Sequence, residues 1–368
     1  MRILHIDPDD MDNPVSGGGP VRTYEICRRL VARGHEVTIL TPTFPGSTPE
    51  KIRDGIRYVR VGRRVGNHGS SHHITFFFQA PRMIAQFPHD LLVEDFMPPM
   101  GPTFTPWFAR KPMVASVQWF SALAWQRQFK LPFVLGGQML MRNYRNYVVL
   151  TDRMNALVRE RLPIARVMTI PNAVSDHYFC QTPRYGDYIL FVGGVARDKG
   201  VDLLLKAFAR IPPNERISLV IAGPGWEFDT FSITTRRLGI SKWVHFVGRK
   251  TQGEVVELYR NCRFVCVPSR FETFGLVIIE AQAAAKSVIL FDQWPMNEVA
   301  NLKGCLVIPP FDVDIYAEGM RKLLNTPTAE LAAIGAANRE FVKRYNWDAS
   351  ADAQEHFYLD ILAAPARQ

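Results

Sequence analysis

The sequence contains no hydrophobic run long enough to cross a membrane. Its 368 residues hold no stretch that approaches the roughly 18 to 20 apolar residues of a spanning helix. The N-terminal residues Met1–Asp7 lack the long apolar region of a signal peptide and have the pattern of a first β-strand. The sequence therefore predicts a cytoplasmic protein.

Cysteines are few and do not form a ligand pattern. There are five, an odd number, and they are scattered along the chain. Cys262 and Cys266 lie close together, but no second Cys or His pair stands at the spacing of a zinc site. We interpret the cysteines as small buried side chains in a reducing compartment, and we expect no metal site.

The first half of the chain has too few acidic residues to balance its basic ones. Residues 1–185 hold 23 Lys and Arg against 14 Asp and Glu, whereas residues 186–368 hold 21 of each, so the first half accounts for the net charge of +9. This excess fits an ordinary solvated surface, or a face toward an anionic lipid headgroup or a phosphorylated carrier. Nucleic acid is disfavoured, because no motif of a nucleic-acid-binding module is present.

Short apolar runs alternate with helix-period stretches, which indicates an α/β fold with parallel sheets. The predicted strands are Arg2–Ile6, Glu36–Thr41, Tyr58–Val61, Leu91–Glu94, Met113–Val117, Tyr147–Leu150, Tyr188–Val192, Ser218–Ala222, Val244–Val247, Phe264–Val267, Val288–Phe291 and Leu306–Ile308. The length suits two domains, and Pro, Asn and Gly interrupt the pattern between Pro171 and Asp187. We therefore predict two doubly wound, Rossmann-like domains, 1–178 and 186–345. Because open parallel sheets bind ligands beyond the carboxyl ends of their strands, we expect the site in a cleft between facing domains.

Two glycine-containing loops follow predicted strands. The first, Ser16–Pro20, has neither the G-x-G-x-x-G spacing of a dinucleotide fingerprint nor the Gly-Lys-Ser/Thr of a P-loop. Its backbone could approach a phosphate closely, although a flexible turn explains it equally well. The second, Phe191–Gly200, adds Arg197 and Lys199, two cations that could hold a diphosphate or lie on a solvated turn.

The most specific pattern is the segment Pro268–Ala281. A buried strand ends in a polar loop that carries Glu272, and Glu280 lies inside the apolar helix that follows. Burying an acid is costly unless something hydrogen-bonds it, and a ribose diol would supply those bonds. The start of this helix also offers an anion site made by the backbone N–H groups of Phe274, Gly275 and Leu276.

These segments together resemble the retaining GT-B glycosyltransferases of family 4, the glycosyl transferases group 1 type. The resemblance covers nearly the whole chain, and its motifs are Gly17-Gly18, Leu30–Thr38, Ile170–Val174, Gly193–Asp202, Glu272–Glu280 and Gly304–Pro310. It implies the GT-B fold, with two Rossmann-like domains facing a central cleft. The first domain would bind the acceptor and the second the nucleotide sugar, and a C-terminal helix at about residues 350–368 would pack back on the first.

The resemblance also implies a role for each matching residue. Glu280 would bind the donor ribose, Glu272 the hydroxyls of the transferred sugar, and Lys199 the diphosphate. Arg249 and Lys250 would frame the base. Further donor contacts would come from the backbone of Gly17, Gly18, Gly193, Phe274, Gly275 and Leu276. Family members usually retain the anomeric configuration and need no metal or cofactor, since the nucleotide sugar is a substrate.

The chain departs from the family pattern at several positions. Gly194 stands where an Arg is usual, so one diphosphate-binding cation is missing, and Arg197 is our hypothesis for its replacement. Gln118 stands where a His is frequent, and it can form hydrogen bonds but cannot become a cation. The usual Gly and Pro after the acid pair are Ala285 and Ser287.

We interpret the chain as a retaining, hexosyl-type glycosyltransferase of glycan or glycoconjugate biosynthesis that uses a UDP-sugar or a GDP-sugar. The acceptor hydroxyl would attack on the front face and lose its proton to the departing diphosphate, which Lys199 stabilises. The alternative is a non-catalytic GT-B relative that acts as a binding or partner subunit, which Gly194, Gln118 and an altered turn at Trp294–Asn297 favour. A sugar-nucleotide epimerase is a weaker alternative, and an oxidoreductase is disfavoured because the dinucleotide fingerprint is missing.

The acceptor is open between a glycan, a lipid-linked glycan and a small molecule. The segment Trp107–Tyr147 of the basic half is rich in aromatic residues and arginines, among them Trp119, Trp125, Arg142 and Arg145. It would meet a lipid-linked acceptor at the anionic inner face of a membrane, as part of a peripheral protein. Core aromatics beside a solvated helix explain the same pattern.

Overall fold

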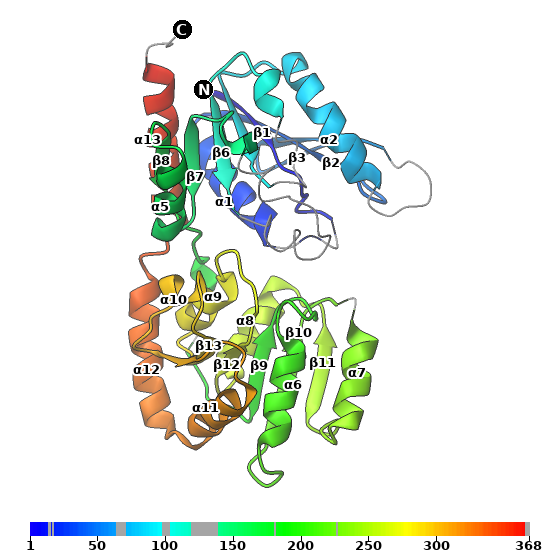
Figure 1. The fold of residues 1–368 in the computed structure, drawn as a ribbon, viewed down its shortest axis with the longest axis vertical. Helices are drawn as coiled ribbons and strands as arrows, with labels where there is room; N and C mark the ends of the chain where they lie inside the picture. Colours follow the sequence, from blue (N-terminus) through cyan, green and yellow to red (C-terminus); the bar gives the residue numbers. More distant parts are fainter. Residues whose placement is uncertain are drawn as a thin grey trace. The chain divides into compact units, whose positions relative to one another are not determined.

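The structure, a computed structural model, divides the chain into two units. The first comprises Met1–Asn172 with Trp347–Gln368, and the second comprises Ala173–Asn346. Figure 1 shows both units with their helices and strands labelled. The residues that the structure describes are 1–13, 16, 18–63, 71–97, 104–118, 139–179, 182–225 and 227–364. Residues 173–178, which the sequence pattern assigns to the first domain, lie in the second unit.

The first unit is built on a sheet with the strand order β3-β4-β2-β1-β5-β6-β7-β8. Its strands are β1 (Arg2–Ile6), β2 (Glu36–Pro42), β3 (Glu50–Arg53), β4 (Ile56–Val61), β5 (Leu91–Asp95), β6 (Met113–Val117), β7 (Asn146–Val149) and β8 (Arg166–Thr169). Neighbouring strands are parallel, except that β3 pairs antiparallel with β4 at the edge. Its helical segments are α1 (Gly19–Ala32), α2 (Ser71–Met83), η1 (Ile84–Gln86), η2 (Thr105–Trp107), α5 (Asp152–Arg161) and α13 (Trp347–Ala363).

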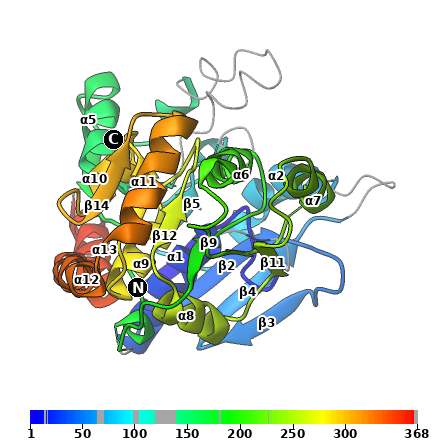
Figure 2. The same cartoon turned by 90° about the horizontal axis from the view of Figure 1, so that it is seen from below.

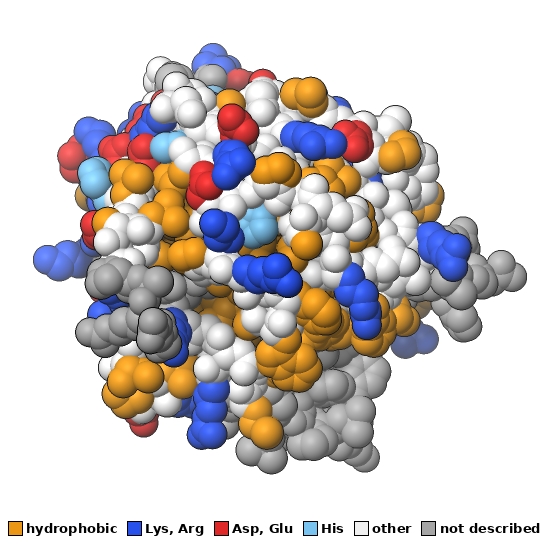
Figure 3. Space-filling view, turned by 90° about the horizontal axis from the view of Figure 1, so that it is seen from above, with side chains coloured by type: hydrophobic (Ala, Val, Ile, Leu, Met, Phe, Trp, Pro, Cys, Tyr) orange, Lys and Arg blue, Asp and Glu red, His pale blue; other side chains and the backbone are white. Residues whose placement is uncertain are grey.

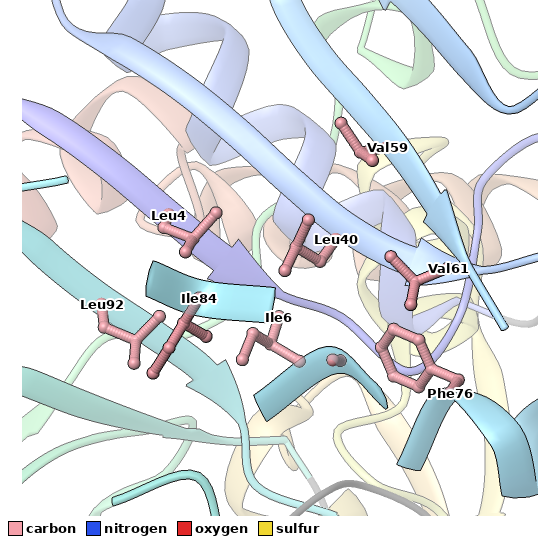
Figure 4. Close-up of a cluster of buried hydrophobic side chains, with 9 residues drawn as sticks. Leu4, Ile6, Leu40, Val59, Val61, Phe76, Ile84 and Leu92 are labelled. Atoms are coloured by element: carbon pink, nitrogen blue, oxygen red, sulfur yellow. The ribbon is translucent and has the colours of Figure 1, made fainter. Parts of the chain in front are cut away.

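A cluster of buried side chains holds α2 and η1 against this sheet. In Figure 4, Leu4, Leu40 and Leu92 from the strands lie around Ile84 of η1, and Phe76 of α2 lies beside Val61. Each of the clustered side chains is at most 6% exposed. The alternation of apolar residues along the strands and the helical spacing of Phe76 and Ala80 produce this packing.

The C-terminal helix α13 packs against α1 within the first unit. Arg29 of α1 contacts Asp348 (2.5 Å), and Arg33 and His35 at the end of α1 contact Glu355 (2.7 and 2.6 Å). Arg29 and Arg33 lie in and just after the last turn of α1, where positive charge also interacts favourably with the helix dipole. The last helix of the chain is therefore part of the structure of its first unit.

The second unit has a fully parallel sheet in the order β11-β10-β9-β12-β13-β14. Its strands are β9 (Tyr188–Val192), β10 (Ser218–Ala222), β11 (Val244–Gly248), β12 (Val265–Val267), β13 (Val288–Phe291) and β14 (Cys305–Ile308). Its helical segments are η3 (Asp176–Tyr178), α6 (Val201–Arg210), α7 (Phe228–Arg237), α8 (Gln252–Asn261), α9 (Leu276–Ala283), α10 (Met296–Val299), α11 (Val313–Asn325) and α12 (Thr328–Val342). Figure 2 shows α6, α7 and α11 on one face of this sheet and α8 and α9 on the other.

Two features bear on membranes and metals. None of the helices in the described ranges is long and apolar enough to cross a bilayer. Within the same ranges, His, Cys, Asp and Glu side chains do not gather in a group of three or more that could hold a metal ion. Cys262 and Cys266 are buried thiols, and Cys180 lies outside the described residues.

Candidate functional site

The two loops that the sequence identifies in the second unit are tied together beyond the carboxyl ends of β9 and β12. The backbone N–H groups of Arg270 and Phe271 donate to the carbonyl oxygen of Asp198, over 2.8 and 3.3 Å. Gly200 lies so close to Pro268 that a Cβ would stand 1.8 Å from its carbonyl oxygen, and its φ of 71° favours glycine. The loop after β9 therefore takes its shape from the loop after β12.

Lys199 and Glu272 form an ion pair at the junction of these loops. The Lys199 Nζ lies 3.0 Å from the Glu272 Oε2 and 3.5 Å from the carbonyl oxygen of Phe271. The hydroxyl of Ser269 donates to the other carboxylate oxygen of Glu272, over 2.8 Å. The Lys199 side chain is 29% exposed, and that of Glu272 is 10% exposed. The cation is thus held in place while part of it stays open to solvent.

A second ion pair, between Arg270 and Asp202, stabilises the loop that carries Lys199. The guanidinium of Arg270 binds both carboxylate oxygens of Asp202 (2.5 and 2.8 Å) and the carbonyl oxygen of Arg197 (2.6 Å). Burial acts to raise the pKa of Asp202, but the hydrogen bond and charge of Arg270 outweigh it, so the pKa lies below its usual value. Arg270, a residue to which the sequence pattern gave no role, is therefore a bidentate brace between α6 and the Lys199 loop.

The Arg197 side chain points elsewhere. It is 74% exposed, and its Nε lies 4.0 Å from the Glu227 Oε1, while its backbone N–H donates to the other oxygen of that carboxylate over 2.8 Å. Among the described residues, Glu227 is the acid with which it forms an ion pair. The structure therefore brings Lys199 and Glu272 together but leaves the Arg197 guanidinium beside Glu227.

Glu280 is held by two tyrosines. The Tyr259 hydroxyl donates to the Glu280 Oε2 over 3.2 Å, and Tyr178 forms a second hydrogen bond to the same carboxyl. Burial raises the pKa of Glu280 to about 7, although both tyrosine hydrogen bonds act to lower it. The ring centroids of Tyr178 and Tyr259 are 5.8 Å apart at 71°. An acid with this pKa inside an apolar helix is a candidate binding group.

The start of α9 lies between these two acids in sequence. Gly275 is its N-cap with a φ of 92°, and Phe274 is buried with its ring packed edge-on against Tyr345 (5.7 Å between centroids). The first N–H groups of a helix, here beginning at Leu276, have no acceptor within the helix, and the helix dipole favours an anion there. The start of α9 therefore offers backbone N–H groups as hydrogen-bond donors next to the segment that carries Glu272.

The remaining donor-site candidates of the second unit lie on neighbouring strand ends. Gly193 follows β9, and its N–H donates to the Ala222 carbonyl oxygen over 2.9 Å. Arg249 and Lys250 follow β11, where Lys250 pairs with Glu254 (3.1 Å), the residue that closes the capping box of α8. These residues share the carboxyl edge of the sheet with Lys199, although no direct contact joins Lys250 to the Lys199–Glu272 pair in the described part of the chain.

In the first unit, Gln118 belongs to a buried polar network that the sequence pattern does not reveal. Its Nε2 donates to the Asp95 Oδ2 over 2.7 Å, and Asp95 also contacts His5 (3.3 Å) and Thr23 (3.4 Å). A carboxylate only accepts hydrogen bonds, so it orients the Gln118 amide. The Gln118 Oε1 then lies toward the start of α1, 3.8 Å from where a Cβ on Gly19 would stand.

The start of α1 carries the first glycine loop. Gly18 is the N-cap of this helix, while Gly17 lies outside the described residues. At the end of β1, burial and then the charge of Asp95 raise the pKa of Asp7 well above its usual value. The Gly18–Gly19 backbone and Gln118 are thus neighbours at the carboxyl edge of the first sheet, above buried acids.

Comparison with known families matches one family model to each half of the chain. The family model described as "Glycosyltransferase Family 4" matches residues 16–178, and the model described as "Glycosyl transferases group 1" matches residues 182–353. The chain carries a glycosyltransferase family 4 domain and a glycosyl transferases group 1 domain. The two matches together take in both glycine loops and the Glu272–Glu280 segment.

Individual relatives are distant. The "D-inositol 3-phosphate glycosyltransferase" of Corynebacterium aurimucosum is 27% identical over 221 residues, which cover 58% of this chain and 48% of that protein, about half its length. Among solved structures, sucrose-phosphate synthase from Thermosynechococcus elongatus superposes with a TM-score of 0.84 at 20% identity, covering 98% of this chain and 99% of that one. Anabaena HepE in complex with UDP-glucose gives a TM-score of 0.75 at 15% identity and covers 98% and 100%.

The superpositions on these solved structures identify the fold. The prediction of an α/β protein of the GT-B type, with two doubly wound Rossmann-like domains, is confirmed by the two sheets, parallel except for the β3 edge, and by the superpositions. The aromatic segment of the family 4 domain, Trp107–Tyr147, contains both core and exposed residues. Tyr144 and Tyr147 are core residues, Trp107 is 73% exposed, and Trp119 and Trp125 lie outside the described residues.

Proposed function

We propose that the protein is a metal-independent glycosyltransferase that moves a sugar from a nucleoside diphosphate sugar to an acceptor hydroxyl with retention of configuration, in glycan or glycoconjugate synthesis. The observation that carries the proposal is the set of Lys199, Glu272 and Glu280 at the carboxyl edge of a glycosyl transferases group 1 domain. The activity in the name of the Corynebacterium relative supports it.

The donor would be a UDP-sugar or a GDP-sugar. A solved neighbour binds UDP-glucose, which favours a uridine nucleotide as the first to test. In our proposal Glu280 accepts hydrogen bonds from the ribose diol, and Arg249 and Lys250 frame the base. The diphosphate would contact Lys199 and the backbone of Gly193, Phe274, Gly275 and Leu276.

The Lys199–Glu272 ion pair is consistent with a donor site that holds Lys199 in place before the nucleotide sugar binds. A partly exposed ammonium that is held by one carboxylate needs only a short movement to meet a diphosphate. The departing diphosphate gains negative charge, which Lys199 and the start of α9 would stabilise. Glu272, released from the pair, would then accept hydrogen bonds from sugar hydroxyls, while Ser269 keeps its other oxygen in place.

Acceptor activation would need no protein base. The attacking hydroxyl and the departing phosphate oxygen would lie on one face of the sugar, so the proton passes between them. Gln118 would serve as a hydrogen-bonding group whose carbonyl oxygen, oriented by Asp95, receives a hydroxyl of sugar or acceptor. Arg197 would reach the diphosphate only after leaving Glu227, so we assign it a secondary catalytic role.

The acceptor would meet the family 4 domain, and we propose that the protein works as a peripheral protein at an anionic membrane surface. The basic excess of the first half supports this assignment.

Transfer in the presence of EDTA tests the proposed function. The protein is incubated with a UDP- or GDP-sugar and candidate acceptors, and the anomeric proton of the product is examined by NMR. We expect a product with the configuration of the donor sugar. Release of nucleoside diphosphate only after a divalent metal is added, or a product of inverted configuration, would contradict the mechanism. Donor binding without any release would favour the non-catalytic alternative.

A further inference from the structure

Helix α2 of the first unit is apolar on two faces. Phe76 and Ala80 are fully buried in the core cluster, whereas Ile74 and Phe78 are 62% and 50% exposed. Ile74, Phe78 and Arg82 follow at intervals of four residues, so they share one side of the helix. Packing of α2 on its own sheet explains the first face and leaves the second without a role.

The residues around η2 extend this second face. The Phe104 ring lies 6.1 Å from Phe78, 6.5 Å from Trp107 and 6.2 Å from Phe108, measured between centroids. Trp107 is 73% exposed and Phe108 is 40% exposed. We call Ile74, Phe78, Phe104, Trp107 and Phe108 the aromatic face. It joins two segments that lie about 30 residues apart in sequence.

The sequence segments that carry the aromatic face are basic and contain no acidic residue. Residues 55–89 and 96–151 contain eleven Lys and Arg but no Asp or Glu. The Arg82 guanidinium lies 5.9 Å from the centroid of the Phe108 ring, and Arg63, Arg110 and Lys111 are exposed close by in sequence. Figure 3 shows a face on which Lys and Arg side chains lie among hydrophobic ones, with acidic side chains mostly toward the upper part of the view.

We propose that the aromatic face docks the protein on an anionic lipid membrane. Exposed Trp and Phe side chains enter the boundary between headgroups and acyl chains, where their burial is favourable. Each nearby Lys or Arg adds attraction to anionic headgroups, and the segments that carry the face contribute no acid that would oppose it. A second copy of this chain would bring like charges together, which makes a membrane the better partner for this surface.

This surface lies on the family 4 domain, and its residues differ from those assigned to the donor. The docking proposal rests on the membrane location proposed above and assigns it to one surface. Its failure would remove that location but leave the donor chemistry standing, and a failure of donor transfer would leave docking standing. If both hold, docking would bring the acceptor-binding domain to lipid-linked acceptors. The aromatic face would then limit the class of acceptor and leave donor binding and cleavage unchanged.

Co-sedimentation with vesicles tests the proposal. Full-length protein is mixed with vesicles of phosphatidylcholine alone or of phosphatidylcholine with phosphatidylglycerol, at low and high salt. We expect binding to the anionic vesicles that weakens at high salt. The double variant Phe78→Ser, Trp107→Ser should weaken binding by about tenfold or more, because two exposed anchors are removed. The variant Arg110→Glu, Lys111→Glu should abolish the preference for anionic vesicles.

The matched control is Ile164→Ser, because Ile164 is 93% exposed and lies in the same unit but outside the aromatic face. It should bind vesicles like the wild type, and thermal denaturation should show that all variants fold. Absence of vesicle binding by the wild type at low salt would overturn the proposal. So would equal binding by the aromatic double variant and the Ile164 control. Loss of self-association, or of RNA binding, in the double variant without an effect on vesicles would assign the surface to that partner instead.

Discussion

Lys199 is the residue on which proposed catalysis depends most. It is the only cation in direct contact with Glu272 in the described part of the chain. Gly194 stands where the family pattern has an arginine nearby. A single group that stabilises developing charge commonly contributes a factor of about 100 to 1000 in turnover. In the absence of a donor, Glu272 compensates the positive charge of Lys199 through this ion pair.

We expect Lys199→Ala to lower donor turnover by about 100- to 1000-fold. Lys206→Ala is the matched control, because Lys206 is exposed on the adjacent helix α6. The measurement is the initial rate of nucleoside diphosphate release at saturating donor. A Lys199→Ala rate close to that of the Lys206 control would remove Lys199 from the mechanism.

Glu280 makes the stability of the folded protein depend on pH. Because burial raises its folded pKa to about 7, above the usual 4.5, the folded state binds its proton more tightly than the unfolded chain. The stabilising effect of this proton is present below about pH 4.5 and is lost as the pH rises through about 7. At pH 8, the partly buried, ionised carboxylate of Glu280 therefore lowers the free energy of unfolding.

Glu280→Gln should relieve this cost. We expect the variant to exceed the wild type in free energy of unfolding at pH 8 by up to about 3 kcal/mol, and to match it near pH 4.5. Thermal or urea denaturation at both pH values measures the difference. Glu257→Gln, at an exposed position of α8, should show no such pH-dependent gain. An equal effect of Glu280→Gln at both pH values would mean that the carboxyl is not held near pKa 7.

At the scale of secondary structure, the end of α9 explains one departure from the family pattern. Ala285 follows the last turn with a φ of 56°, in the left-handed region that alanine rarely adopts. The Lys286 N–H donates to the Ala281 carbonyl oxygen and the Ala285 N–H to that of Gln282, the two bonds of a Schellman motif. This is the position at which the resemblance expects glycine. The backbone conformation is therefore that of a glycine, although the residue is alanine.

Ala285→Gly should consequently stabilise the protein by about 1 kcal/mol, because glycine adopts this φ without a steric penalty. Ala283→Gly, inside α9, is the matched control and should destabilise it by about 1 kcal/mol. Urea denaturation of both variants measures the two changes. If Ala285→Gly destabilised the protein as much as the control does, loss of the buried methyl group would outweigh the backbone strain.

The strands and helices could be predicted from the sequence where apolar residues recur with the period of one kind of secondary structure. Apolar runs predict every strand in the described residues except β3 and β8. β3 (Glu50–Arg53) is a charged edge strand that depends on its antiparallel pairing with β4, and β8 (Arg166–Thr169) is a short edge strand with a single buried position. Neither carries the buried apolar run of a central strand, so their pairing partners, rather than their own residues, define them.

The same distinction applies to the candidate site. Glu272, Glu280 and Lys199 stand in short motifs, and the sequence predicts them. Their partners Tyr178 and Tyr259, and the Asp95 that orients Gln118, come from distant parts of the chain. A tyrosine 102 residues before Glu280 carries no local signal of that contact. The fold brings these groups together, so only the structure could identify them.

At the scale of the whole molecule, each unit carries its own part of the proposed reaction. The donor candidates other than the first glycine loop lie in Ala173–Asn346, whereas Gln118, Gly18 and the aromatic face lie in the first unit. The GT-B fold is shared by proteins with different donors and acceptors, so the fold alone does not name either substrate. The identity of the donor has to come from binding.

The central claim is that the glycosyl transferases group 1 domain binds and cleaves a nucleotide sugar through Glu280 and its neighbours. The most direct test is binding and hydrolysis of a panel of uridine, guanosine, adenosine and thymidine diphosphate sugars, without metal. Wild type, Glu280→Ala and the control Glu257→Ala are compared. We predict that one donor binds and is slowly hydrolysed, and that Glu280→Ala alone weakens its binding by about 10- to 100-fold. If no donor binds or is hydrolysed, or if Glu280→Ala binds as the wild type does, the claim is wrong.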